Sequence, residues 1–254
     1  IGGTGKTSLC IKLNEILFNK KIKSCFIKKF YKNQYDEQRI LKNNGELFVS
    51  SDRFKAIKQA EEKNYEVAII DDGLQDNSIS YDIRILCFNN INWIGNGMTI
   101  PSGPLREDIN SIKKYEHIFL NGNLENLEGL KKKILKINSN AKIYVGEYQP
   151  TNIDEFNKDE NYIVFSGIGN HKTFISMLKK YHIKIHKDFE YADHYQYKME
   201  DIDKIVEEAN NFNCEIITTE KDYVRLSNYN NHKIRYIKSR LNILDEKNLI
   251  KLIS

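Results

Sequence analysis

The sequence begins with the motif GGTGKT (Gly2 to Thr7), placed directly before a stretch whose apolar residues have helical spacing. Glycines let consecutive backbone N–H groups curl around phosphate oxygens, while the lysine reaches the terminal phosphates and the hydroxyl serves Mg²⁺. The helix predicted from Lys6 to Phe18 adds a dipole that favours an anion at its start. We therefore predict an ATP phosphate site formed by Gly2, Gly3, Thr4, Gly5, Lys6 and Thr7.

A second motif combines a short apolar run, Val67 to Ile70, with the two acids Asp71 and Asp72. A buried strand that ends in an acid presents its carboxylate to Mg²⁺ at the carboxyl edge of a parallel sheet. We predict that Thr7, Asp71 and Asp72 hold Mg²⁺ and that one of the two acids also orients the metal or a substrate hydroxyl.

A third motif is PSGPLRE, from Pro101 to Glu107. Two prolines and a glycine restrict this loop, which is expected to deliver Arg106 and Glu107 at the start of a helix. An arginine can hold a phosphate with two hydrogen bonds or stabilise the charge on a phosphoryl group in transfer. The alternative is a surface turn with a helix-capping ion pair.

The alternation of apolar strands and helical stretches predicts an α/β fold with mainly parallel sheets. We expect a P-loop NTPase-like domain over residues 1–147, a polar linker over 148–160, and a smaller α/β domain over 161–254. The predicted helices are Lys6–Phe18, Arg53–Lys63, Leu127–Ile137, Lys172–Tyr181 and Met199–Phe212. The predicted strands are Ile22–Ile27, Val67–Ile70, Ile83–Phe88, His117–Leu120, Lys142–Val145, Tyr162–Phe165, Ile183–His186 and Glu215–Thr218.

The charge and the cysteines exclude some classes of function. The 39 basic and 35 acidic residues nearly balance, so the charge does not indicate a nucleic-acid partner. Four dispersed cysteines without a CxxC pair predict buried thiols rather than disulfides or a metal site. No run of 18 apolar residues occurs, although a chain that opens inside a motif without Met leads us to expect a preceding segment that carries a signal or an anchor.

Several motifs together resemble the tetraacyldisaccharide 4′-kinase family of lipid A biosynthesis. The resemblance covers essentially the whole chain, with the motifs in the same order. They are GGTGKT, DDGLQ (Asp71 to Gln75), GNG (Gly95 to Gly97), PSGPLRE, NG (Asn121-Gly122), FSGIGN (Phe165 to Asn170), ADHY (Ala192 to Tyr195) and TTEKD (Thr218 to Asp222).

This resemblance implies transfer of the γ-phosphate of ATP, with Mg²⁺, to the 4′-hydroxyl of tetraacyldisaccharide 1-phosphate. Asp36 matches the base of the family's GDEP element, although the flanking Gly and Pro are missing, and His194 matches its partner. The two lie in different predicted domains, so their pairing requires both domains to face one cleft. The implied catalytic residues are Asp36, Asp72, Arg106 and His194, and the implied substrate-binding residues are Glu37, Arg53, Gln75, Arg106 and Glu107. Lys28 to Tyr31 departs from the family's SRGY-like stretch.

The resemblance also implies a site of action. A multiply acylated substrate implies contact with the cytoplasmic face of the inner membrane of a Gram-negative bacterium, by peripheral or N-terminal anchoring, without nucleic acid or an obligate protein partner. Two alternatives remain: a P-loop kinase or NTPase acting on a soluble small molecule, and a nucleotide-binding module without activity. ATP turnover that requires the lipid would exclude the first alternative. The second alternative leaves the candidate base Asp36 without a purpose, because nucleotide binding alone needs no base.

Overall fold

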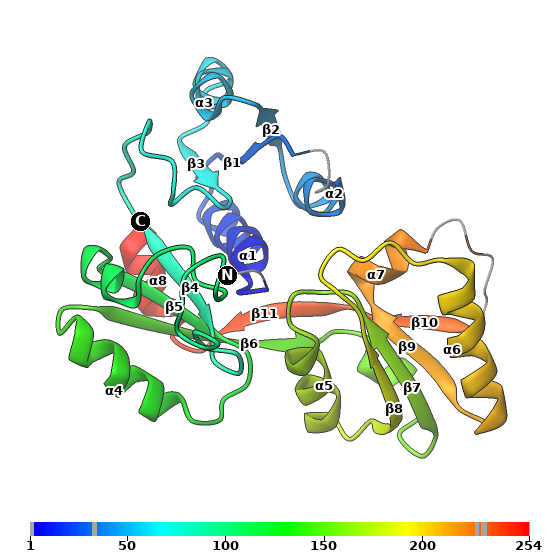
Figure 1. Ribbon diagram of the computed structural model, residues 1–254. Helices are drawn as coiled ribbons and strands as arrows, with labels where there is room; N and C mark the ends of the chain where they lie inside the picture. The colour runs from blue at the N-terminus through cyan, green and yellow to red at the C-terminus, as the bar shows by residue number, and fades with distance from the viewer. Residues whose placement is uncertain (1–2, 32–34, 227–228, 230–232, 254) are drawn as a thin grey trace. The chain divides into compact units, whose positions relative to one another are not determined.

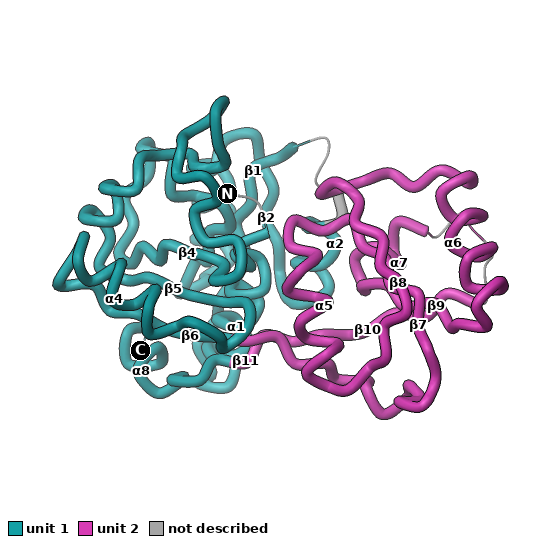
Figure 2. Tube along the Cα trace, turned by 60° about the horizontal axis from the view of Figure 1, so that its bottom comes forward, with its two compact units in different colours: residues 1, 3–146, 243–254 teal, residues 2, 147–242 magenta. Residues whose placement is uncertain are grey.

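The computed structural model describes residues 3–31, 35–226, 229 and 233–253, leaving out the side chains of residues 35 and 36. These residues form an α/β fold of parallel sheets covered by helices, which confirms the predicted fold class (Figure 1). The chain divides into two compact units (Figure 2). Unit 1 comprises Gly3–Gly146 and Ile243–Ser254, and unit 2 comprises Glu147–Asn242.

The first sheet of unit 1 has the strand order β2-β1-β3, with parallel pairing on both sides of β1. Its central strand is fully buried at Cys25, Phe26 and Ile27, as expected for a parallel strand covered on both faces. Small residues of α3, Ala56 and Ala60, allow that helix to pack closely against the sheet. The elements are α1 (Lys6–Asn19), β1 (Ser24–Lys29), α2 (Tyr35–Asn43), β2 (Leu47–Ser50), α3 (Arg53–Glu62) and β3 (Val67–Ile70).

A second sheet has the order β11-β6-β5-β4; its strands β4 and β5 belong to unit 1, and the residues of β6 and β11 are divided between the two units. Ile118 and Leu120 of its strand β5 pack against Leu130 and Ile134 of α4. The elements are β4 (Ile85–Asn89), the 3₁₀ helix η1 (Ile109–Lys114), β5 (His117–Asn121), α4 (Leu127–Ile137), β6 (Lys142–Pro150), β11 (Ser239–Ile243) and α8 (Glu246–Ile253). The last residues of the chain therefore belong to unit 1, whereas the sequence assigned them to the second domain.

Unit 2 contains one parallel sheet with the order β10-β9-β7-β8. Side chains of β7 alternate between its faces, so that Val164 joins a core with α5 and Phe165 joins one with α6. The elements are η2 (Ile153–Glu155), β7 (Asn161–Ser166), α5 (His171–Lys180), β8 (Lys184–Glu190), α6 (Met199–Asn211), β9 (Glu215–Thr219), α7 (Glu220–Arg225) and β10 (Ile234–Ile237).

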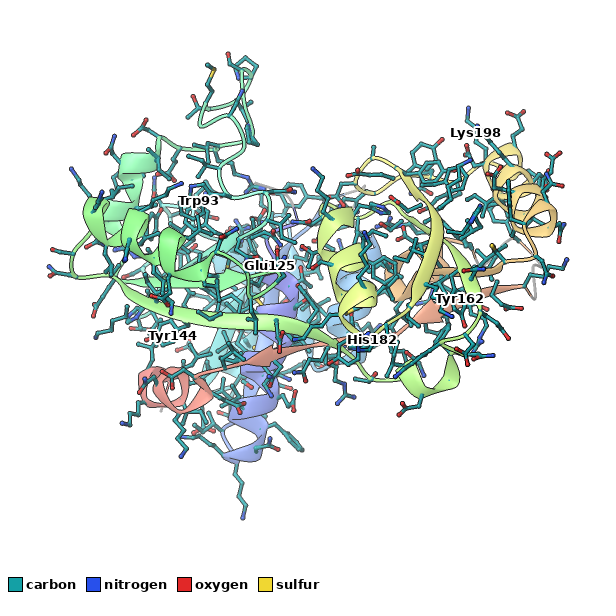
Figure 3. The ribbon with its side chains drawn as sticks, turned by 90° about the horizontal axis from the view of Figure 1, so that it is seen from below. Trp93, Glu125, Tyr144, Tyr162, His182 and Lys198 are labelled. Atoms are coloured by element: carbon teal, nitrogen blue, oxygen red, sulfur yellow. The ribbon has the colours of Figure 1, made fainter. Side chains whose placement is uncertain are left out.

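The segment predicted as a linker, 148–160, is packed into unit 2. Ile153 and Phe156 are buried in the core on the α5 side of the sheet. Tyr162 (Figure 3), which is fully buried, donates its hydroxyl to the carbonyl of Asn157 at 2.8 Å. This polar segment is therefore not a free linker, because its apolar residues Ile153 and Phe156 pack into the core of unit 2.

The structure also bears on the cysteines and on the membrane. All four cysteines are free thiols; Cys10 and Cys25 are buried, as predicted, whereas Cys87 and Cys214 are only partly buried. Within the ranges described above, no helix combines the length and the apolar character that crossing a bilayer requires.

Candidate functional site

The loop before α1 adopts the tight course that its glycines allow. Gly3 and Gly5 have φ angles of 66° and 75°, in the left-handed region that glycine enters without strain. Gly5 precedes the helix and has no side chain to cap it, so the first N–H groups of α1 remain suited to an anion. Gly2, also predicted to bind phosphate, lies outside the described residues.

The buried Asn121 at the end of β5 reaches this loop. Its side-chain amide donates a hydrogen bond to the carbonyl of Thr4, and its amide oxygen accepts one from Asn89 at the end of β4. The carboxyl ends of two neighbouring parallel strands thus fix the loop, at the sheet edge where α/β proteins bind ligands. In the sequence, Asn121 is recognisable only as part of the NG motif, which predicts no role for its side chain.

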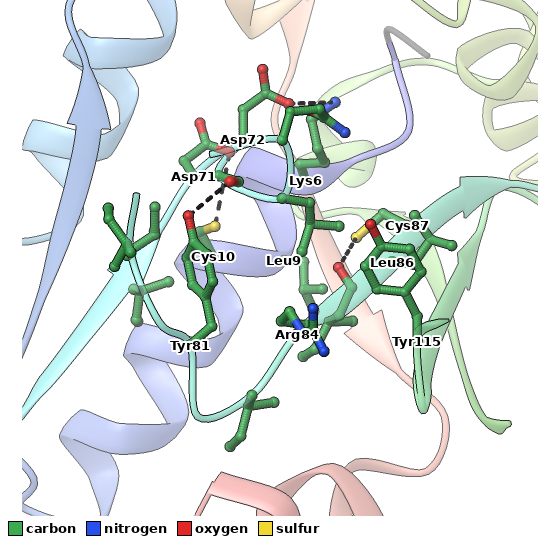
Figure 4. Close-up of a pocket in the computed structure, with 18 of the residues that line it drawn as sticks. Lys6, Leu9, Cys10, Asp71, Asp72, Tyr81, Arg84, Leu86, Cys87 and Tyr115 are labelled. Carbon is green, nitrogen blue, oxygen red and sulfur yellow. Dashed lines mark hydrogen bonds and ion pairs between the residues drawn. The ribbon is translucent and has the colours of Figure 1, made fainter. Parts of the chain in front are cut away.

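Asp71, which follows β3, lies beside the loop and is 1% exposed. Its Oδ2 accepts a hydrogen bond from the Thr7 hydroxyl at 3.2 Å and one from the Lys28 ammonium at 2.6 Å. The Cys10 thiol faces its other oxygen at 3.9 Å (Figure 4). Two of the three residues predicted to hold Mg²⁺, Thr7 and Asp71, are therefore brought together.

Lys28 is the main site residue that the sequence did not reveal. It is 2% exposed on β1, and its Nζ contacts both Asp71 and Glu37 at 2.6 Å. Burial disfavours the charged ammonium, but the two carboxylates outweigh this effect and raise the pKa of Lys28. The sequence offered one sign of its importance, a lysine within the apolar residues of a strand. It did not reveal the partners of this lysine, because Glu37 and Asp71 lie 9 and 43 residues away in the chain.

Asp72 adjoins Asp71 but faces a different set of charges. Lys6 Nζ lies 3.5 Å from Asp72 Oδ1, and Arg106 Nη1 lies 3.0 and 3.1 Å from its two oxygens. Arg106 also donates to Gln75 Oε1 at 2.9 Å. Burial alone would raise the pKa of the Asp72 carboxyl, but the charges of Lys6 and Arg106 outweigh it and lower the pKa. The predicted Lys6, Asp72, Gln75 and Arg106 form one cluster.

The backbone of Asp72 has a φ of 55°, which is uncommon for a residue other than glycine. Arg53, 5% exposed, donates from Nη2 to the Asp72 carbonyl at 2.8 Å and from Nη1 to Asp76 at 2.9 Å. Arg53 was predicted to bind a substrate phosphate. In the structure its guanidinium donates to the turn that carries Asp72.

The PSGPLRE loop ends at the Asp72 cluster but does not open into a helix there. The 3₁₀ helix η1 begins at Ile109, and Asp108 caps it by accepting from the Asn110 N–H at 2.8 Å. The predicted helix start at Arg106 and Glu107 is therefore wrong by a few residues. Buried Leu105 anchors the loop through backbone hydrogen bonds with Met98 and Ile100.

A cavity of about 930 Å³ lies next to these residues. Its polar end contains candidate phosphate and substrate residues, and its remaining lining includes apolar side chains of α1, β3 and β4 (Figure 4). The polar end is lined by Thr4, Lys6, Asp71, Asp72, Gln75, Arg106 and Glu107.

The oxygen donors at this end fit Mg²⁺. Thr7 and Asp71 offer a hydroxyl and a carboxylate, the hard ligands that Mg²⁺ takes when water and substrate phosphates supply the rest. Among the residues that the structure describes, no group of three or more His, Cys, Asp or Glu side chains could hold a metal.

The predicted base and its partner belong to different units. Asp36 lies in the first turn of α2 in unit 1, and its side chain is outside what the structure describes. His194 lies in unit 2 with a φ of 60°, and its Nε2 is 3.8 Å from Asp193 Oδ1. Its backbone N–H donates to the carbonyl of Gly167 at 3.0 Å.

Comparisons with known proteins match the whole chain to one family. The family described as "Tetraacyldisaccharide-1-P 4'-kinase" (LpxK) matches residues 1–254. A protein named tetraacyldisaccharide 4′-kinase from Pelagibacter ubique (strain HTCC1062) is 60% identical over 249 residues, covering 98% of this chain and 79% of the relative. Its namesake from Rickettsia akari (strain Hartford) is 31% identical over 253 residues, covering 91% and 75%.

A solved structure shares the fold. The crystal structure of LpxK from Aquifex aeolicus, determined in complex with ATP, superposes with a TM-score of 0.67 and covers 100% of this chain and 84% of that one. Its sequence identity is 24%, so this likeness concerns the fold.

Proposed function

The chain belongs to the tetraacyldisaccharide-1-P 4′-kinase family and is a phosphotransferase of lipid A biosynthesis, and we propose that its chemistry takes place at the polar end of the unit 1 cavity. The reaction moves the γ-phosphate of ATP to the 4′-hydroxyl of tetraacyldisaccharide 1-phosphate. The observation that carries the proposed site is the convergence of Asp71 on Thr7 and of Asp72 on Lys6, at 3.2 and 3.5 Å.

The loop and α1 receive the phosphates of ATP. The backbone N–H groups of residues 3–7 and the start of the helix favour an anion, and Lys6 adds a positive charge that can reach the terminal phosphates. Bound beside Thr7 and Asp71, Mg²⁺ would neutralise charge on the phosphates. The buried Lys28 fixes the orientation of the Asp71 carboxylate toward Thr7.

Lys6 and Arg106 supply the charge that phosphoryl transfer requires. Negative charge spreads over the equatorial oxygens of the moving group, and preorganised cations stabilise it in a site shielded from water. Both side chains contact Asp72, which holds them in place and keeps them on one side of the cavity. Gln75 fixes Arg106 from the other side, and Glu107 offers a carboxylate to the hydroxyls of the sugar.

We assign the proton transfer to Asp36. A sugar hydroxyl is a weak acid, so a carboxylate must accept its proton as the oxygen attacks phosphorus and the bond to ADP breaks. His194 assists by orienting this carboxylate and sharing the proton. Glu37, which neighbours Asp36 on α2, is tied to Lys28 at 2.6 Å and thereby links the helix of the base to Asp71.

We also propose that the protein works at the cytoplasmic face of the inner membrane of a Gram-negative bacterium. A substrate with several acyl chains stays in a bilayer, because burying each methylene group contributes about 0.8 kcal/mol. The enzyme must therefore approach the membrane surface to reach the 4′-hydroxyl.

The test uses ATP turnover by the purified protein with and without tetraacyldisaccharide 1-phosphate in mixed micelles. We expect turnover to depend on the lipid and Asp36→Ala to lower it by about 10²- to 10⁴-fold while ATP binding persists. Glu62→Ala, which removes an exposed acid from α3 of the same unit, is the matched control and should behave as wild type. Equal hydrolysis without lipid would refute the proposed acceptor, and unchanged turnover of Asp36→Ala would refute the base.

A further inference from the structure

The TTEKD motif of unit 2 places a fully buried carboxylate among hydrogen-bond donors. Asp222 is 0% exposed and lies in the short helix α7, directly after β9. Its Oδ1 accepts from the N–H of Gly167 at 3.0 Å and from the Tyr197 hydroxyl at 2.9 Å, while Oδ2 accepts from the Thr219 hydroxyl at 2.6 Å. Arg225 completes the set with Nη1 at 3.0 Å from Oδ1. Both oxygens are thus used within the protein.

These contacts converge on the backbone of one residue, Gly167. Its N–H donates to Asp222, and its carbonyl accepts from Arg225 Nη1 at 2.7 Å. A side chain at this position would meet the Tyr197 hydroxyl at 3.0 Å and Tyr195 Cβ at 3.1 Å, so the surroundings close tightly around the glycine. The Gly167 backbone is therefore held both by its N–H, through Asp222, and by its carbonyl, through Arg225.

The same carbonyl receives the backbone N–H of His194 at 3.0 Å. His194 has a φ of 60°, a conformation that a residue other than glycine keeps only when its surroundings impose it. The Gly167 carbonyl is one such constraint, and Asp222 and Arg225 fix that carbonyl in turn. A chain of three hydrogen-bonded steps thus leads from the buried acid to the backbone of His194.

We propose that Asp222, together with Arg225, is a positioning residue that holds His194 in place for phosphate transfer. This inference rests on the proposed function, in which His194 assists the base. The function of the TTEKD motif is then to support a turn rather than to contact substrate. An acid suits this task because an ionised carboxylate accepts several donors at once and holds the guanidinium by charge.

A double-mutant cycle tests the proposal on the full chain. Asp222→Asn keeps the size of the side chain but removes its charge, and should lower kcat by about 10-fold, since misplacing a catalytic group by about 1 Å can cost about 10²-fold. The KM for ATP should stay unchanged. In a His194→Ala background, Asp222→Asn should lower kcat no further, because the residue through which it acts is already gone.

The controls separate positioning from general stability. Leu178→Ala removes a fully buried side chain from the core on the α5 side of unit 2, a core that includes neither Gly167 nor His194, and should lower Tm while leaving kcat of the folded protein near wild type. If Asp222→Asn does not fold, Arg225→Lys keeps the positive charge with altered geometry and takes its place in the cycle. Its loss of kcat should likewise vanish in the His194→Ala background.

Two results would overturn the inference, and they differ. If Asp222→Asn lowers kcat by the same factor in the His194→Ala background as in wild type, Asp222 does not act through His194. The proposed role of His194 would then stand. Wild-type kcat in His194→Ala would instead remove His194 from the proposed function, and the inference with it.

Discussion

Two turns, one in each unit, carry candidate catalytic residues in the same unusual conformation. Asp72 in unit 1 and His194 in unit 2 have φ angles of 55° and 60°. Each turn depends on a buried arginine paired with an aspartate, Arg53 with Asp76 in unit 1 and Arg225 with Asp222 in unit 2. Each arginine also donates to a backbone carbonyl, Arg53 to that of Asp72 and Arg225 to that of Gly167.

The two arrangements differ in how directly the pair acts. Arg53 donates to the carbonyl of Asp72 itself, whereas Arg225 reaches His194 only through the Gly167 carbonyl that both contact. Their acids differ too, because the Asp76 side chain is 19% exposed and that of Asp222 is fully buried. An arginine can therefore support the backbone of a catalytic turn without contacting substrate. Because Arg53 contacts its turn directly and Arg225 only through Gly167, loss of Arg53 should lower activity more than loss of Arg225.

The strongest test of this comparison separates the conformation of Asp72 from its charge. Asparagine has the same shape and tolerates the left-handed region, so Asp72→Asn should lower phosphate transfer by about 10²- to 10³-fold with little change in Tm. Asp72→Ala should lose as much activity and also destabilise the protein by about 1–2 kcal/mol through backbone strain. Single-turnover transfer and thermal unfolding measure the two effects. Equal Tm values for both variants would show that the turn is not strained.

The next largest effect is expected from Arg53→Ala. The Asp72 carbonyl and the Asp76 carboxylate lose their donor, so the turn relaxes, and kcat should fall by about 10²-fold. The KM for the lipid should stay near wild type. If Arg53 instead contacts a substrate phosphate, as its sequence motif indicates, that KM should rise more than kcat falls. Steady-state kinetics with varied lipid distinguish these two roles.

Asp76→Asn should have the smallest effect, because the amide oxygen still accepts from Arg53. The Ser78 hydroxyl and then the Arg53 guanidinium lower the pKa of Asp76 from 3.8 to about 2 in the folded protein. The ionised form therefore stabilises the fold above pH 3.8, and this stabilisation is lost as the pH falls toward 2.

The difference in Tm between wild type and Asp76→Asn should consequently be largest near neutral pH and narrow below pH 4, reaching about 2–4 °C for each kcal/mol involved. Asp159→Asn is the matched control because the Asp159 side chain is 94% exposed. A difference that stays constant from pH 7 to pH 3 would contradict a stabilising charge at Asp76.

The parts of the molecule that the sequence predicted well depend on local chemistry. The helix expected over Lys6–Phe18 is found at Lys6–Asn19, because its glycine-rich start and its apolar spacing lie within one short segment. The strand Val67–Ile70 was also predicted with its observed bounds, since an apolar run that ends in an acid is a pattern of neighbouring residues.

The parts that the sequence did not predict depend on contacts between distant segments. Lys28 appeared only as a departure from a family motif, although its ammonium joins Asp71 and Glu37. The role of Arg53 is set by a turn 19 residues away. The return of the chain through β11 and α8 into unit 1 likewise has no local signature, because it follows from pairing with β6.

The buried Arg53 is inferred to act on phosphate transfer through Asp72. The most direct test of this inference is single-turnover transfer of radiolabelled γ-phosphate to tetraacyldisaccharide 1-phosphate by the double variant Arg53→Ala/Asp72→Asn, compared with Asp72→Asn alone. Equal rates are expected, because the Asp72 carboxylate that Arg53 helps to position is already absent from both variants. A further loss of about 10²-fold in the double variant would show that Arg53 acts independently and would contradict the claim.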